Sequence, residues 1–201
     1  MKNTFLTKLL KASAKTCMLA VIGLGLAFNS VVVHADDRGV HKGQIMWLNH
    51  FDLLSGDTSE LTTTYKSTSS GVGGGLTGLV IQSSTLGDTF FSGGNRVVHM
   101  ALELPKQTKI TGVRVCYEYS SNSSSFISQI RLAQVQNPPS SALVMLDDPT
   151  DLTTPGPVCV NSALVKPAFK AKNGPILLSL RIDTRNINDK IVIRGLGVFV
   201  K

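Results

Sequence analysis

Ile176-Leu177-Leu178-Ser179-Leu180-Arg181-Ile182-Asp183 is the stretch of this sequence that decides the fold. Its apolar residues occupy every second position, and the positions between them become polar or charged toward the end of the stretch. Because successive side chains of a β-strand point to opposite faces of a sheet, this period of two predicts a strand with one face on a core. Helical spacing of apolar residues is hard to find after residue 35.

The same alternation recurs along the chain. It is clear at 97–104 and 113–119 and less regular at 126–132. Apolar segments of strand length predict further strands at 44–48, 76–82, 142–146, 158–161 and 191–200. Most prolines fall between these segments, as residues that interrupt strands should. About eight or nine short strands predict an all-β fold, an antiparallel β-sandwich of jelly-roll type, with a closed β-barrel as the alternative.

The C-terminal segment 191–200 changes the phase of its alternation. Isoleucines at 191 and 193 fall in one phase, whereas apolar residues at 196, 198 and 200 fall in the other. One extra residue at Arg194-Gly195 would keep both groups facing the core, which is the effect of a β-bulge, and glycine is the usual residue there. We expect a bulge at this point; the alternative is two separate strands.

Residues 1–35 have the layout of a secretory signal peptide. Four lysines and no acidic residue lie before an apolar run at 17–28. After this run, Val33-His34-Ala35 fits a signal peptidase site. The apolar run is shorter than the roughly 20 residues of a membrane-spanning helix, so we expect cleavage after Ala35 rather than an anchor. The mature chain would be secreted or periplasmic without membrane insertion, with a flexible leader at 36–43 and a single domain at 44–201.

Cleavage also changes the charge and the partners it implies. The chain has 20 basic and 13 acidic residues, but four of the lysines lie within 1–35, so the basic excess falls from seven to three. The remaining chain has no run of lysine and arginine and no aromatic motif typical of RNA binding. We therefore expect no nucleic-acid partner.

The cysteines predict one disulfide. Cys17 would leave with the signal peptide, and Cys116 and Cys159 would remain in an oxidising compartment. Their bond would close a span of 43 residues, for which the chain-entropy model gives about 4 kcal/mol of stabilisation. A reactive thiol or a metal pair is the alternative, but no further histidine or cysteine lies at ligand spacing.

The stretch 62–75, rich in Ser, Thr and Gly, predicts a mobile surface loop. Gly73, Gly75 and Gly78 match the spacing of the dinucleotide-binding fingerprint. That fingerprint needs a strand before it and the N-terminus of a helix after it, whereas here a polar loop precedes and a strand-like segment follows. We expect no cofactor.

Hydrolytic chemistry has no concentrated signature in the sequence. No serine lies in a G-x-S-x-G elbow. His99 and Glu103 share a strand face, but four residues of strand separate them by about 13 Å. His41 falls in the expected leader. We expect a protein that is not an enzyme, with a hydrolase whose site is not visible in the sequence as one alternative.

Two weak ligand sites are visible. Trp47 and His50, followed by Phe51, form a small aromatic and polar patch that suits stacking on a sugar ring; a core or rim role for Trp47 is the alternative. Asp147, Asp148 and Asp151 cluster in a turn of the kind that binds Ca²⁺, although the EF-hand spacing is absent and a solvated turn is the simpler interpretation.

These observations favour an exported, non-catalytic binding module for glycan, cell-wall material or an envelope protein. One tryptophan and three tyrosines are few for a glycan binder, which counts against that choice. The other alternative is a structural or assembly component of the envelope or of an extracellular layer, using the edges of its sheets for partners.

Overall fold

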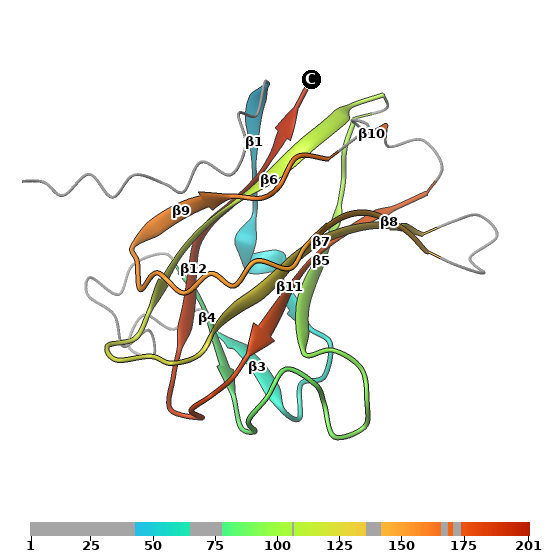
Figure 1. Cartoon of the computed structure of the whole chain (residues 1–201). Helices are drawn as coiled ribbons and strands as arrows, with labels where there is room; N and C mark the ends of the chain where they lie inside the picture. Colours follow the sequence, from blue (N-terminus) through green and yellow to red (C-terminus); the bar gives the residue numbers. More distant parts are fainter. Residues whose placement is uncertain (1–42, 65–77, 106, 136–141, 166–168, 171–173) are drawn as a thin grey trace, which may run out of the picture. The chain divides into compact units, whose positions relative to one another are not determined.

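The protein folds as two antiparallel β-sheets packed face to face (Figure 1). The computed structural model describes residues 43–64, 78–105, 107–135, 142–165, 169–170 and 174–201. The predicted sandwich is confirmed and the closed barrel is wrong, because the described strands form two separate sheets. The predicted signal peptide at 1–35 and nearly all of the expected leader lie outside the described residues.

The first sheet has seven described strands, centred on β12 (Ile191–Val200). One side of β12 pairs along its length with β6 (Lys109–Tyr119). The other side pairs first with β4 (Leu79–Ser83) and then with β1 (Gln44–Leu48). The remaining strands of this sheet are β3 (Leu61–Thr64), β9 (Val158–Asn161) and β10 (Phe169–Lys170).

The second sheet has five described strands, and the stretch 176–183 lies at its centre as β11 (Ile176–Asp183). The strand order is β2 (Leu54–Ser55), β5 (Val97–Leu102), β11, β7 (Phe126–Val135) and β8 (Ala142–Asp148). A one-turn 3-10 helix, η1 (His50–Asp52), connects β1 to β2. Within the described residues, no helix is long and apolar enough to cross a membrane.

All nine expected strands are present, and three short ones were missed: β2, β3 and β10. The predicted loop at 62–75 begins too early, because Thr62–Thr64 belong to β3 and pair with β4. Threonine favours strands through its branched side chain, so the polar composition concealed a strand. Residues 65–75, including Gly73 and Gly75 of the rejected fingerprint, lie outside the described residues.

The predicted bulge is confirmed. The register of β12 against β6 shifts between Ile193 and Gly195, so the strand stays continuous and the alternative of two separate strands is wrong. Ile193 and Leu196, on either side of the shift, are both fully buried.

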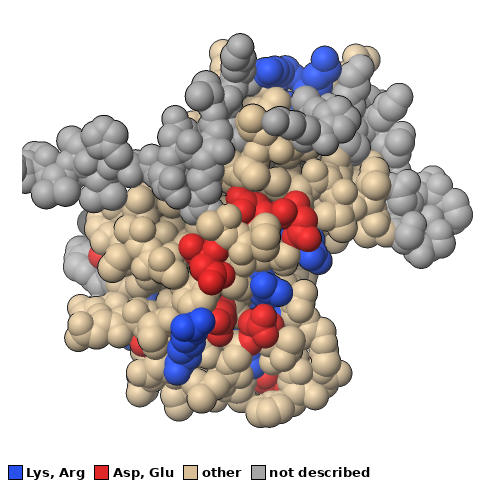
Figure 2. Space-filling model, viewed as in Figure 1, with Lys and Arg blue, Asp and Glu red and all other residues tan. Residues whose placement is uncertain are grey.

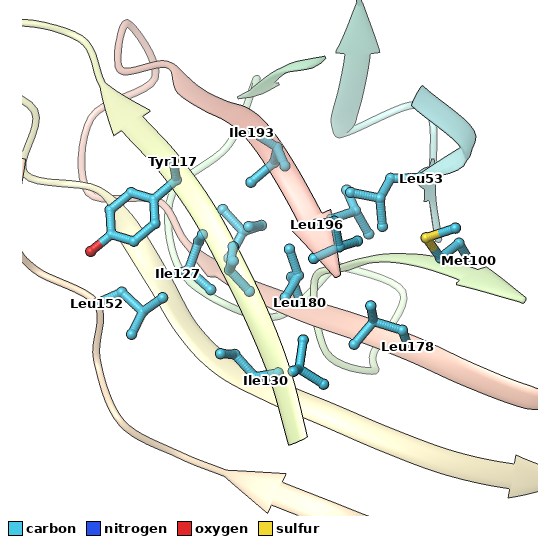
Figure 3. Close-up of a cluster of buried hydrophobic side chains, with 14 of the residues drawn as sticks. Leu53, Met100, Tyr117, Ile127, Ile130, Leu152, Leu178, Leu180, Ile193 and Leu196 are labelled. Carbon is cyan, nitrogen blue, oxygen red and sulfur yellow. The ribbon is translucent and has the colours of Figure 1, made fainter. Parts of the chain in front are cut away.

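The core lies between the two sheets (Figure 3). Leu178 and Leu180 of β11 are completely buried and meet Leu196 of β12 from the opposite sheet. Full burial of a leucine contributes about 1.5–3 kcal/mol, so the alternating apolar residues of both sheets are a main source of the stability of the sandwich.

The predicted disulfide is confirmed as a cross-strand bond. Cys116 of β6 lies directly opposite Cys159 of β9, and their sulfurs are bonded. The alternatives of a reactive thiol or a metal pair are therefore wrong. The bond holds β9 at the side of the first sheet, where the strand is only four residues long.

Asp189 connects two loops at one end of the sandwich. Its carboxylate accepts hydrogen bonds from the amides of Ser124 and Ser125, both at 2.9 Å, and from the Ser125 hydroxyl at 2.7 Å. Burial by itself raises the pKa of Asp189, but these donors stabilise the charged form and hold the pKa below its ordinary value of 3.8. The loop before β7 is thus tied to the loop before β12.

We expect Asp189→Asn to destabilise the fold by about 1–3 kcal/mol at neutral pH, since a neutral amide oxygen accepts these bonds more weakly than a charged carboxylate oxygen does. A depressed folded-state pKa gives stability that is complete above the unfolded pKa and is lost as the pH falls through the folded pKa. The variant should therefore lose part of the fall in stability below about pH 4. Urea unfolding between pH 3 and pH 7 measures this. Asp183→Asn, which alters a half-buried carboxylate paired with Arg185, is the control. An unchanged pH profile in the Asp189 variant would contradict the assignment.

Candidate functional site

A pocket lies at one open side of the sandwich, between β1 of the first sheet and β5 of the second. Among the described strands, β1 pairs only with β12, and β2 covers β5 only at Val98 and His99. The later part of β5 therefore forms a free edge facing β1. The pocket has a volume of about 350 Å³ and is lined by Met46, Trp47, Leu48, Asn49, Asp52, Met100, Ala101, Leu102 and Glu103. We call it the Trp47 pocket.

Trp47 is held at the rim of this pocket by the alternation of β1. Met46 and Leu48 pack against the core, so Trp47 between them turns outward, and 57% of its surface is exposed. It lies opposite Gly197 in the ladder with β12. Its ring atoms Cε3 and Cζ3 come within 3.3 Å and 3.4 Å of the points where Gly197 and Gly195 would carry a Cβ. The indole thus rests against bare backbone.

The polar side of the pocket comes from η1 and from the end of β5. Asn49 caps η1: its side-chain oxygen accepts from the Phe51 amide at 3.3 Å, and its amide nitrogen donates to Asp52 at 2.9 Å. Because an N-cap side chain is fixed by the helix it caps, Asn49 and Asp52 hold one arrangement. Glu103 follows β5 directly and is exposed.

The structure separates the two residues of the predicted aromatic patch. Trp47 lines the pocket, whereas His50 does not, and its ring instead lies 4.3 Å from that of Phe51. Sequence reasoning missed Asn49, Asp52 and Glu103. The first two follow Trp47 closely and were within reach of a search for polar neighbours. Glu103 could not be found in that way, because its location beside Trp47 depends on which edges of the two sheets face each other.

The predicted calcium cluster is not assembled. Asp147 and Asp148 are neighbours in β8, so their side chains point to opposite faces. Asp147 accepts from Gln129 at 2.5 Å and from Arg131 at 3.2 Å, while buried Asp148 accepts from the Ala163 amide at 2.7 Å. Asp151 is exposed. In the described part of the chain, no three His, Cys, Asp or Glu side chains are grouped for a metal.

His99 lies outside any hydrolytic arrangement among the described residues. It sits in β5 opposite Ser179 of β11 and Leu54 of β2, and it is half-buried on the outer face of the second sheet. Glu103 lies four residues farther along the chain, beyond the end of the same strand. The expected separation of His99 from Glu103 therefore agrees with the backbone.

Charges of both signs are interspersed on the face seen in Figure 2. Arginines of the described residues pair with acids: Arg131 with Asp147, Arg181 with Asp88 and Arg185 with Asp183. A field of one sign, which would steer a polyanion toward the molecule, is not visible on this face.

Comparison with known proteins gives distant structural similarities. No family model matches the chain, and no curated protein matches it. The chain is similar to TmCBM61, solved in complex with β-1,4-galactotriose, at 13% identity and a TM-score of 0.42, covering 83% of this chain and 97% of that one. A family 29 carbohydrate-binding module follows at 12% identity and a TM-score of 0.37, with coverage of 78% and 86%. An exo-β-1,3-galactanase from Phanerochaete chrysosporium, solved with galactose, has 12% identity and a TM-score of 0.34, with coverage of 80% and 30%. Similarity this low carries no argument about the site, which rests on its own geometry.

Proposed function

We propose that this protein is an exported, non-catalytic binding module that takes a sugar ring at the Trp47 pocket. The observation that carries the proposal is the state of Trp47. A large flat ring is 57% exposed, rests against two glycines and stands beside a pocket that has hydrogen-bonding groups. Phe91 and Leu54 are exposed to a greater degree, so the exposure of Trp47 gains its weight from the pocket and the polar groups beside the ring.

The chemistry of a sugar ring matches this pocket. One face of a pyranose presents C–H groups, which pack on an aromatic face, while its edges carry hydroxyl groups. Asp52 and Glu103 accept hydrogen bonds from hydroxyl groups, and Asn49 can also donate one. Met46 and Met100, which also pack with the core, add apolar lining to the pocket.

A binding role suits the exposure of the two acids better than catalysis does. Asp52 and Glu103 are both exposed to solvent. A general acid that cleaves a glycosidic bond needs a pKa raised by burial, and the reaction gains from the exclusion of water. On the basis of the predicted signal peptide, we propose that the module binds its glycan in the periplasm or outside the cell.

One measurement tests this proposal directly, because Trp47 is the only tryptophan in the chain. We expect a saturable change in intrinsic tryptophan fluorescence, and protection from acrylamide quenching, when the purified protein is titrated with its ligand from a broad glycan and cell-wall panel. Calorimetry on the same samples reports binding wherever it occurs. Heat of binding without a fluorescence change would place the site elsewhere.

A panel without any binding would favour the assembly role instead. One observation supports that second candidate. The edge strand β8 exposes Leu143 and Val144, at 51% and 48%, and exposed apolar edges pair with other strands. Sedimentation that depends on protein concentration, abolished by Val144→Lys, would then identify self-association through β8.

A further inference from the structure

We infer that the Trp47 pocket selects a sugar that carries a free, positively charged amine over its neutral, N-acetylated counterpart and over acidic sugars. This inference rests on the proposed function and names the class of ligand. It follows from the charges of the pocket together with the chemistry of its aromatic rim.

The charge of the pocket has one sign. Of its nine lining residues, Asp52 and Glu103 are the charged ones, and none is lysine, arginine or histidine. Asp52 receives one hydrogen bond, from the neutral amide of Asn49. Neither acid forms an ion pair with a lysine or arginine within the described residues.

Elsewhere the protein pairs some of its acids with arginine. Five carboxylates of the described residues are paired with arginine, including Glu118 with Arg194 at 2.7 Å on the first sheet and Glu60 with Arg96 at 2.9 Å. The Trp47 pocket instead leaves two acids beside a cavity. A cationic ligand would supply the missing counter-charge, while a uronic acid or a phosphorylated sugar would meet repulsion from both.

The rim of the pocket favours the same ligand. A cation within about 6 Å of an indole face is attracted by the negative face of the ring, and tryptophan is the strongest side chain in this respect. An ammonium group on a sugar stacked at Trp47 would therefore interact with the ring and with the carboxylates. Acetylation of the amine removes its charge and both attractions, while the sugar ring and its stacking surface remain.

The test compares ligands that differ only at the nitrogen. The probes are tetramers of β-1,4-linked glucosamine and of galactosamine, each as the free amine and as the N-acetyl form, titrated against the purified protein at pH 6. We expect at least one free-amine tetramer to bind about tenfold more tightly than its acetylated form, with the advantage shrinking in 0.5 M salt. Glu103→Gln should reduce the advantage of the free amine over the acetylated form to about threefold or less, whatever its effect on the affinity for the acetylated form.

Asp151→Asn is the matched control, because Asp151 is an exposed acid outside the pocket lining. The preference of this variant for the free-amine tetramer over the acetylated one should equal that of the natural protein. Equal affinity for both forms of each tetramer, or a preference untouched by Glu103→Gln, overturns the inference. If acetylated tetramers still change the fluorescence of Trp47 in that case, the proposed sugar site stands. If neither form of either tetramer binds, the inference is overturned as well, and the glycan panel then decides the proposed function separately.

Discussion

Replacing Arg96 with methionine will lower the free energy of unfolding by about 3 kcal/mol or more. Arg96 begins the approach to β5 and is only 1% exposed. Its guanidinium donates to the carbonyl oxygens of Thr85 and Gly87, at 2.9 Å and 2.7 Å, and to Glu60 at 2.9 Å. Methionine fills a similar volume but donates nothing, so buried acceptors would be left without partners, at about 1–3 kcal/mol each.

The loss should be large because the buried Arg96 guanidinium bonds to two other segments of the chain at once. Glu60 precedes β3 of the first sheet, the carbonyl groups belong to the loop after β4, and Arg96 itself leads into β5 of the second sheet. Glu60 also accepts from the amide of Phe91, so the same network sets the end of that loop. Burial by itself raises the pKa of Glu60, but the Phe91 amide, Thr85 and Arg96 hold it below the ordinary value.

Urea unfolding followed by circular dichroism measures the effect, with Arg131→Met as the matched control. Arg131 pairs with Asp147 at 3.2 Å, but 35% of its side chain is exposed, and exposed ion pairs contribute about 0–1 kcal/mol. Equal midpoints for the two variants would mean that the Arg96 network adds no more than a surface pair does.

This network could not be predicted from the sequence. Glu60, Thr85 and Arg96 are separated by 25 and 11 residues, and no local pattern relates them. The alternation at 176–183 was sufficient to predict a strand, because the polarity of each residue indicates which face of the sheet its side chain lies on. A network that crosses between sheets depends on which loops meet, and that is a property of the topology.

Features of the strands were likewise predictable only where they are visible within one segment of the sequence. The bulge at Arg194-Gly195 was predictable because the change in phase of the apolar alternation falls within ten consecutive residues. The strands β2 and β10 have two residues each, too few for a period of two to be seen. The end of β8 shows the cost of a misplaced boundary. It was expected at 146 and lies at Asp148, so Asp147 and Asp148, interpreted as a cluster, point to opposite faces.

The candidate site was predictable in part. Trp47 was identified because it is the single tryptophan and stands in a strand beside polar residues. The glycines that support it lie 148 and 150 residues farther along the chain, and only the pairing of β1 with β12 relates them to the ring. Sequence patterns thus found the ring but not its support or the acid on the facing edge.

On the proposed function, Trp47→Ala will weaken glycan binding by about 30-fold or more, which corresponds to about 2 kcal/mol. The indole is the largest surface that a sugar ring can contact in the pocket, and tryptophans at the centre of binding sites commonly contribute this much. Trp47→Phe should retain part of the affinity, because a smaller aromatic face still stacks. Calorimetry or affinity electrophoresis is needed here, since the variants lack the fluorescent ring.

The control for this variant is Phe91→Ala, which removes an aromatic ring that is 88% exposed on the loop between β4 and β5 and does not line the pocket. Its affinity should equal that of the natural protein. A third variant separates the ring from its support: Gly195→Ala would place a methyl group 3.4 Å from the Trp47 ring. If the glycines only allow close strand packing, this variant will bind normally. If they set the plane of the indole, it will lose affinity while keeping all nine pocket side chains, and the stacking geometry itself is then what the sugar recognises.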